Sequence, residues 1–358
     1  MQKTYTEPYI VLILLTALLL PLLCRAQQNP MFTQYMFNSL TFNPAYAGSK
    51  EYLSANILYR TQWAGWNNPG NGLNPELETG GAPVTQTFTV HTPVGTRLGA
   101  GLSVVNDKIG ATESTGANLS YAYRIAFAEG ELALAVQGGI TNFRGDFAGL
   151  IARDPLFSDA AFTEQMPNVW RPNFGAGLYY HSKTFYLGMS VPRLLESSLR
   201  DAAPAEQRND NPARTYQHFY FTTGGAIPLK GNPDFVFRPS VLVKSVGLFG
   251  ELKRQGNSTT IIGAPTEFDA DISLFLYKTL WLGLSFRSSF EIFITGQSSY
   301  DSMDAWLAFY LKNGLRIGAA YDFSLTPVQK YSIGSLELSV GYDFNYSEIE
   351  QVNSPRYF

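Results

Sequence analysis

The stretch LELSVGYDF, residues 336–344, decides the fold of this chain. Leucine, valine, tyrosine and phenylalanine stand at its even positions, and small or ionic residues stand at its odd positions. Successive side chains of a β-strand point to opposite faces of the sheet, so this strand has one apolar face and one polar face. An apolar face rich in aromatic residues, backed by a face that carries charges, is typical of a transmembrane β-barrel strand.

The same alternation recurs along the chain. In residues 314–323, Arg316 and Asp322 stand opposite the apolar positions, and in residues 267–277 Asp269 does so. We predict about fourteen antiparallel strands of this kind. They are expected at residues 52–62, 84–93, 97–106, 115–126, 131–143, 173–181, 184–191, 216–228, 235–246, 267–277, 279–288, 303–311, 314–323 and 335–344.

The predicted strands are joined by long and short connections in alternation. The short ones are turns such as 128–130 and 312–313, and outer-membrane barrels place such turns in the periplasm and their long loops outside. The fold class is therefore all-β, an antiparallel outer-membrane β-barrel over residues 51–344. The long connections are expected at 63–83, 107–114, 144–172, 192–215, 247–266, 289–302 and 324–334.

The composition agrees with a barrel. Charged residues make up 15% of the 358 residues, against roughly 25% in soluble domains. Aromatic residues reach 14% and glycines number 32, while a mean hydropathy of −0.07 is low for a bundle of membrane-spanning helices. The net charge of −3 gives no reason to expect nucleic acid as a partner.

Residues 1–26 are predicted to be a secretory signal peptide. Lys3 precedes an apolar run from Tyr9 to Cys24, and Ala26 supplies a small residue for cleavage. The alternative is a membrane anchor, for which the run is shorter than the roughly 20 residues that a spanning helix needs. Removal of the signal would take away the only cysteine, so no disulfide is expected.

Two further segments lie outside the predicted barrel. Residues 27–50 carry Phe32, Tyr35 and Phe37 at helical spacing. Apolar side chains placed so densely favour burial, which predicts a short ordered element packed at or in the barrel mouth. The alternative is a disordered periplasmic lead-in. Residues 345–358 form a polar tail, which is expected in the periplasm with residues 27–50.

Several stretches of the chain resemble the PorP/SprF family of type IX secretion system membrane proteins. The resemblance runs from about residue 27 to the end, in the family's own order. The N-terminal family motif consists of Asn43, Pro44, Ala45, Tyr46 and Gly48. The stretches that carry the resemblance are QYMFN (34–38), NPAYAG (43–48), YRTQW (59–63), LGAGLSVVNDKIG (98–110), PSVLVK (239–244) and SPRYF (354–358).

The resemblance implies a non-enzymatic outer-membrane protein that serves export through the type IX machinery. Some family members are core components that associate with periplasmic ring lipoproteins. Others are paired with one large secreted adhesin or surface protein, which the barrel helps to export or retain by binding its C-terminal domain. No cofactor is expected.

Partner contacts are expected in the parts that proteins can reach. The loops 66–83, 144–172 and 192–215 look least like the family, and surface loops vary most where partners differ. Aromatic residues and arginine are the types favoured at interface hot spots. A purely structural alternative is that the loop residues only cap the barrel rim. The candidates are Trp66, Phe157 and Trp170 in the loops, and Arg356, Tyr357 and Phe358 in the tail.

Two other sets of residues belong to the barrel itself. Gly341, Tyr342 and Phe344 resemble the aromatic-terminated signal that is read during barrel assembly. The acidic residues around 267–271 suit a cation at oxygen-ligand spacing, but we predict that they pair across the lumen with basic residues. The predicted lumenal charges are Arg60, Arg238, Lys244, Asp269, Asp271, Arg287, Arg316 and Glu337, with Glu267 beside them.

Catalysis has little support in the sequence. The histidines His91, His181 and His218 are isolated on or near predicted strands, and no hydrolase or phosphate-binding motif is present. No metal or small-molecule substrate is expected. Two alternatives remain open: a diffusion channel or hydrophobic-substrate transporter, which would pass a small solute, and an outer-membrane hydrolase, which would need a paired nucleophile and base.

Overall fold

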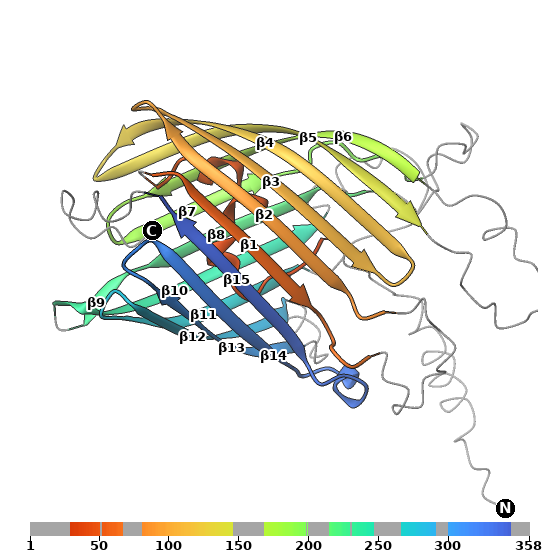
Figure 1. Ribbon diagram of the computed structural model, residues 1–358. Coiled ribbons are helices and arrows are strands. Elements are labelled where there is room, and N and C mark those ends of the chain that lie inside the picture. The colour runs from red at the N-terminus through yellow and green to blue at the C-terminus, as the bar shows by residue number, and fades with distance from the viewer. Residues whose placement is uncertain are drawn as a thin grey trace, which may run out of the picture.

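The computed structural model describes residues 29–50, 52–66, 81–145, 168–197, 199, 215–229, 231–246, 266–290 and 300–344. Its strands form one antiparallel sheet that closes into a barrel (Figure 1). The strands are β1 (Ser54–Thr61), β2 (Val84–Val94), β3 (Leu98–Ile109), β4 (Thr112–Phe127), β5 (Gly130–Gly145), β6 (Asn168–His181), β7 (Phe185–Val191), β8 (His218–Gly225), β9 (Ile227–Leu229), β10 (Asn232–Val246), β11 (Glu267–Leu276), β12 (Leu280–Ser289), β13 (Tyr300–Tyr310), β14 (Leu315–Ser324) and β15 (Ser335–Asp343).

The first and last strands close the barrel. β1 pairs with β2 on one side and with β15 on the other, from Ser54 opposite Asp343 to Thr61 opposite Leu336. β8 and β9 are separated only by Ala226 and both pair with β10, so they form one interrupted strand. The wall therefore has fourteen strand positions, which confirms the predicted fold. Closure satisfies the backbone hydrogen bonds of every strand, which a strand in lipid requires.

The two faces of the wall divide as the sequence predicts. Along β15, Leu338 is 58% exposed on the outside while Glu337 is 0% exposed on the inside. The outward apolar residues form the lipid-facing surface and the inward polar residues line the lumen. None of the helices in the described ranges is long and apolar enough to cross a membrane.

The barrel has two unlike ends. We call one the turn end, where short turns such as 95–97 and 128–129 connect the strands and where β1 begins and β15 ends. The opposite end is the loop end. It carries the connections that follow β1, β3, β5, β7, β10, β12 and β14.

One predicted long connection is wrong. Residues 107–114 form a tight hairpin at the loop end, because β3 continues to Ile109 and β4 begins at Thr112. Gly110 lies between them with φ +57°, a conformation that glycine adopts without strain.

The predicted loop 144–172 is shorter at its end than expected. β6 begins at Asn168, so Trp170 lies on a strand opposite Asn142 and not in a loop.

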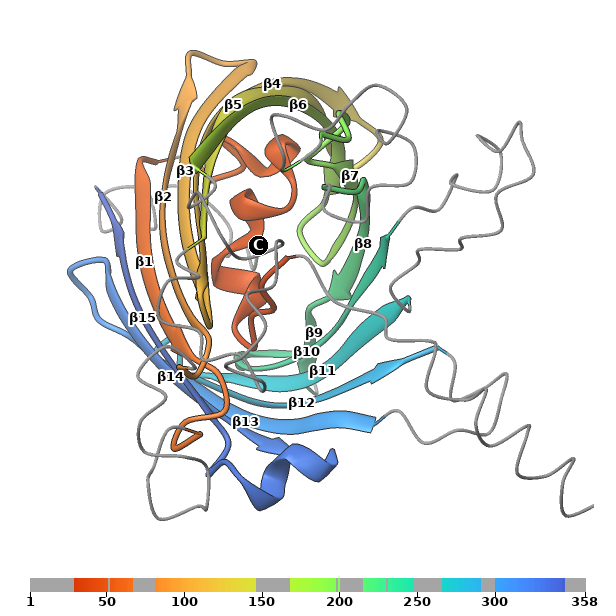
Figure 2. The same cartoon turned by 90° about the vertical axis from the view of Figure 1, so that its right-hand side faces the viewer.

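Residues 29–50 lie inside the barrel and cross its lumen (Figure 2). We call this segment the plug. At the loop end, Lys244 Nζ at the end of β10 donates to the carbonyl oxygen of Asn29. At the turn end, Lys50 Nζ lies 3.0 Å from Asp343 Oδ1. The segment predicted at or in the barrel mouth thus crosses the lumen from one end to the other.

The prediction that residues 27–50 lie at one end of the barrel is wrong, because the plug runs from one end to the other. Residues 27–50 and 345–358 were expected together at one end of the barrel, but Asn29 lies at the loop end, while Lys50 and Phe344 lie at the turn end. The plug contains three short 3-10 helices, η2 (Tyr35–Phe37), η3 (Ser39–Thr41) and η4 (Pro44–Tyr46). A fourth 3-10 helix, η7 (Pro327–Lys330), lies between β14 and β15.

The lipid-facing surface gives a first prediction. Replacing Leu338, in the middle of β15, by arginine should lower the free energy of unfolding by about 2–4 kcal/mol, because the charge would enter the lipid near its midplane. The measurement is urea unfolding in lipid vesicles, followed by the mobility of unheated samples on gels. Ile333→Arg is the matched control, because Ile333 is 66% exposed in the connection at the loop end. Equal losses in the two variants would contradict the assignment of the lipid face.

Candidate functional site: the plug and its contacts with the barrel wall

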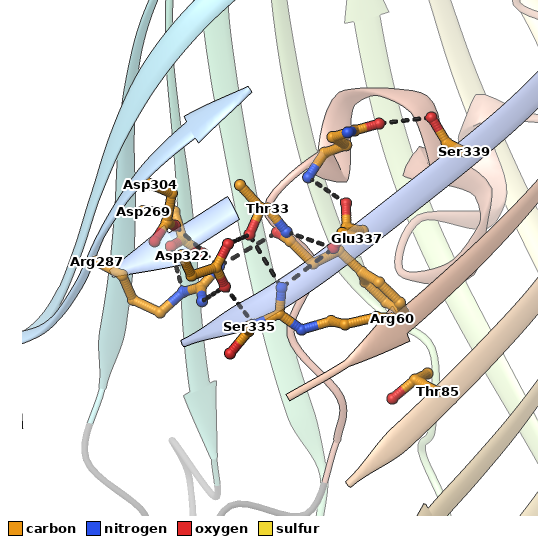
Figure 3. Close-up of polar contacts among 12 residues, drawn as sticks. Thr33, Arg60, Thr85, Asp269, Arg287, Asp304, Asp322, Ser335, Glu337 and Ser339 are labelled. Carbon is orange, nitrogen blue, oxygen red and sulfur yellow. Dashed lines mark hydrogen bonds and ion pairs between the residues drawn. The ribbon is translucent and has the colours of Figure 1, made fainter. Parts of the chain in front are cut away.

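In the loop-end half of the barrel, one carboxylate holds the plug. Glu337 on β15 accepts hydrogen bonds from the backbone N–H groups of Thr33 at 2.9 Å and Gln34 at 2.7 Å (Figure 3). The side chain of Gln34 in turn accepts a bond from Ser339 Oγ at 2.5 Å. Charged acceptors make stronger hydrogen bonds than neutral ones, so Glu337 fixes the backbone of the plug at this level.

Arg60 ties this anchor to the neighbouring strands. Its guanidinium lies 2.5 Å from Asp322 on β14 and 3.3 Å from Glu337 on β15, and it also donates to Thr33 Oγ1 at 3.0 Å. Thr33 Oγ1 donates to Asp322 at 2.5 Å. The plug hydroxyl therefore lies inside an ion pair between wall strands that are far apart in the sequence.

A second guanidinium extends the cluster. Arg287 on β12 lies 2.6 Å from Asp269, 3.7 Å from Asp322 and 3.8 Å from Asp304, and it donates to the carbonyl oxygen of Phe32 at 3.3 Å. Figure 3 shows these side chains converging on the same part of the plug. We call Arg60, Asp269, Arg287, Asp304, Asp322 and Glu337 the ionic cluster. Its members come from β1 and from β11 to β15.

The family motif forms the turn-end part of the plug. Asn43 Oδ1 accepts from the backbone N–H of Ala45 at 3.0 Å, which caps η4, and Asn43 Nδ2 donates to the carbonyl oxygen of Leu178 on β6 at 3.1 Å. Pro44 occupies the first position of η4, where a missing N–H costs no hydrogen bond. Ala45 is fully buried. The motif thus builds a compact turn that is bonded to the wall.

The end of the motif meets a histidine that the sequence analysis treated as a wall residue. The N–H of Gly48 donates to His91 Nδ1 on β2 at 3.2 Å. The ring of Tyr46 lies edge-on to His91 at 5.2 Å and to Tyr179 at 5.4 Å. His91 is therefore on the wall, as predicted, but it also holds the plug.

Two wall glycines explain how the plug approaches so closely. A Cβ atom on Gly99 would overlap the carbonyl oxygen of Ala47, and a Cβ atom on Gly177 would overlap Asn43 Oδ1. Glycine at these two positions therefore leaves room for the backbone and the capping side chain of the plug.

Only some of the predicted lumenal charges form ion pairs with one another. Lys244 lies 3.5 Å from Glu267, and Arg287 lies 2.6 Å from Asp269. Both pairs join directly opposed residues of neighbouring strands, so these acidic residues pair along the wall and not across the lumen. Asp271 instead accepts hydrogen bonds at 2.7 Å from both Ser285 and Trp306. Among the described residues, no group of three potential ligands could hold a metal ion.

Arg238 and Arg316 lie apart from the ionic cluster, towards the turn end. Arg238 stacks on the ring of Trp281 at 3.8 Å, and Arg316 stacks on the ring of Phe37 at 4.2 Å. Phe37 also meets Trp281 edge-on at 5.1 Å. These two arginines and the plug ring thus form one stacked group.

The residues predicted to contact a partner do not lie together in the described part of the structure. Trp66 packs against Trp63 at 5.9 Å and Tyr331 at 6.0 Å, in an aromatic group at the loop end. Trp170 is 58% exposed on the outer face of β6. Phe157, Arg356, Tyr357 and Phe358 lie outside the described residues.

The predicted assembly signal lies at the closing seam. Tyr342 and Phe344 are exposed and their rings meet edge-on at 4.6 Å, while the N–H of Phe344 donates to the carbonyl oxygen of Leu53. Gly341 faces the lumen, where a Cβ atom would collide with the guanidinium of Arg316.

Three of the wall residues that bond to the plug, Arg60, Arg287 and Glu337, were predicted as lumenal charges. Asp304 and Asp322 were not among the predicted site residues, nor was Thr33 of the plug, and His91 was taken for a wall residue. The stretch QYMFN (34–38), which belongs to the plug, was noted because it carries the family resemblance. The resemblance gave it no structural role. Polar residues on the inner face of a strand look alike in sequence whether they meet water or the plug.

Seating of the plug can be tested at Gly99. In Gly99→Val, the new side chain would occupy the space of the Ala47 backbone, so we expect the plug to leave the wall while the barrel still forms. Chymotrypsin, which cuts after aromatic residues, should then cleave within residues 29–50 faster than in the unsubstituted protein. Gly138→Val is the matched control, because a Cβ atom there meets Phe174 at an ordinary 3.7 Å. Unchanged resistance of Gly99→Val would show that Gly99 does not seat the plug.

Comparisons with known proteins bear on this barrel and its plug. A family model described as type IX secretion system membrane protein PorP/SprF matches residues 24–342. A search among curated proteins gave no match.

Several solved outer-membrane barrels are similar in backbone, and at such low identity the likeness concerns the fold alone. The P. putida toluene transporter TodX is 10% identical, with 86% of this chain and 94% of that chain covered and a TM-score of 0.46. A Pseudomonas aeruginosa FadL homologue is 13% identical, with 85% and 93% covered and a TM-score of 0.44. The Acinetobacter baumannii outer membrane protein Omp33 is 9% identical, with 83% and 100% covered and a TM-score of 0.40.

The family match extends over most of the chain and includes both the plug motif and the barrel strands. It confirms the resemblance on which the sequence analysis relied, and with the barrel fold it places the protein in the outer membrane of a Gram-negative bacterium. The chain belongs to the PorP/SprF family of type IX secretion system membrane proteins.

Proposed function

We propose that this protein is a non-enzymatic component of the type IX secretion system that aids the export or surface retention of a large secreted protein. It would do so by binding the C-terminal domain of that protein or the periplasmic ring subunits of the machinery. Family membership supports the link to type IX secretion. The plug supports the mode of action, because a filled lumen leaves the two ends of the barrel as the surfaces for partners.

The packing of the plug carries this proposal. Tyr35 and Leu40 in the plug are buried against the wall, and Glu337 and Arg60 anchor Thr33 in the loop-end half of the barrel. Between the plug and the wall, the described residues line a cavity of about 140 Å³. A cavity of about 150 Å³ holds a molecule of the size of benzene, so this space does not accommodate a polypeptide chain in transit.

We propose that the loop end faces the cell exterior, because outer-membrane barrels have long loops outside and short turns in the periplasm. Trp66 and its aromatic neighbours would then be available to a secreted partner at the cell surface. Phe344 and the tail that follows it would face the periplasm, where Arg356, Tyr357 and Phe358 are candidates for contact with ring subunits.

Affinity purification from native outer membranes tests the partner proposal. We expect type IX subunits or one large surface protein to co-purify with the barrel, and Trp66→Ala to reduce recovery of the secreted protein severalfold at an unchanged barrel level. Phe309→Ala is the control, because Phe309 is 47% exposed near the turn end. Equal recovery of the secreted protein from both variants would remove Trp66 from the partner surface. A purification that yields no type IX subunit and no secreted protein would contradict the proposed function.

Conductance distinguishes this function from that of a diffusion channel. Because the plug occupies the lumen, the purified barrel in planar lipid bilayers should show no open channel. Gly99→Val, which would unseat the plug, should produce conductance that the Gly138→Val control does not. A stable open channel in the unsubstituted protein would favour the alternative of a diffusion channel.

A further inference from the structure

A cavity of about 140 Å³ lies at the turn end, between the plug and the wall. Lys50 at the end of the plug, Ser54 at the start of β1 and Asp343 at the end of β15 line it there, and Phe37 of the plug lines its inner side. The cavity is separate from the ionic cluster, since none of the six residues of that cluster is among its described lining residues.

One wall of the cavity offers hydrogen-bond donors that have no acceptor. Arg316 on β14 is 4% exposed, and its Nη2 donates to Asn56 Oδ1 on β1 at 2.7 Å. Neither Arg316 Nε nor Asn56 Nδ2 has a hydrogen-bond acceptor among the described residues, although both atoms are buried. A buried donor without an acceptor is costly, and a buried charge is normally paired. These two side chains therefore supply hydrogen-bond donors, one of them charged, for an anionic acceptor.

The charges around the cavity favour the same ligand. Lys50, Arg238 and Arg316 line it, and Asp343 is the one acidic residue among its described lining residues. Asp343 is already engaged, because Lys50 Nζ lies 3.0 Å from its carboxylate and Ser54 Oγ donates to it at 2.6 Å. The Arg316 guanidinium has no carboxylate within ion-pair distance in the described part of the chain.

The remaining lining is aromatic. Trp281, Tyr310 and Phe37 line the cavity around Arg316, and Arg316 lies over the rings of Phe37 at 4.2 Å and Tyr310 at 5.7 Å. Stacking on two rings holds the guanidinium plane in place, so its donors are oriented before a ligand arrives. The volume suits one ring or a side chain of similar size next to the anionic group.

We infer that this cavity binds a carboxylate attached to a ring-sized apolar group, through Arg316 and Asn56. The chemistry is that of a free aromatic acid or of a peptide that ends in an aromatic residue. The guanidinium and the amide take the carboxylate oxygens, and the aromatic walls take the apolar group. This inference does not depend on the proposed function in secretion.

Calorimetry with the full chain in a nonionic detergent tests the inference. The probes are phenylacetate and a short peptide with a C-terminal phenylalanine, each compared with its uncharged amide. We expect at least one acid to bind, with its amide weaker by about tenfold or more, because a hydrogen bond to a charged group is worth more than a neutral one. Binding of the peptide acid alone identifies a chain terminus as the source, and binding of phenylacetate alone identifies a small acid.

Two substitutions locate the site. Arg316→Gln removes the charge, and Asn56→Asp places an internal carboxylate beside Arg316 without disturbing its stacking on Phe37. Both should weaken binding of the acid by about tenfold or more. Arg97→Gln is the control for net charge, because Arg97 is exposed in a turn at the same end. The inference is wrong if neither acid binds, if acid and amide bind equally, or if Asn56→Asp leaves binding unchanged.

Discussion

The rest of the structure depends on the hydrogen bonds that the backbone N–H groups of Thr33 and Gln34 donate to the carboxylate of Glu337. They join the last strand of the wall to the plug, and Arg60 joins both to the first strand. Breaking a buried ion pair by removing one partner typically costs about 3–5 kcal/mol, because the other charge is left unpaired. The ionic cluster therefore makes the plug an integral part of the barrel interior.

The rest of the lumen is consistent with this anchoring. Wall glycines stand where the plug backbone comes close, as at Gly99, and a capping asparagine in the family motif bonds to the opposite wall at Leu178. A water-filled channel would need neither feature. The plug and the polar inner face of the wall together form the packed interior of the barrel. The outer face of the wall is the surface that lipid contacts.

The sequence predicted the wall better than the lumen. Alternation in residues 336–344 identified the lipid face because contact with lipid constrains every second residue locally. The hairpin at 107–114 was mistaken for a loop because it carries ionic residues at Asp107, Lys108 and Glu113, so the alternation disappears there. The placement of residues 29–50 within the barrel was partly predictable from their apolar spacing. The bond between Thr33 and Glu337 was not, because nothing local to either residue specifies a partner 304 positions away.

That separation has a consequence for the order in which the molecule folds. Contacts between residues so distant in sequence are slow to form, because most of the chain must be organised before they stabilise anything. Glu337 and Arg60 lie on the two strands that meet at the seam, so the pocket for Thr33 exists only once the seam has joined. Seating of Thr33 in this pocket therefore cannot precede closure of the wall. The anchor of the plug is among the last contacts of the molecule to form.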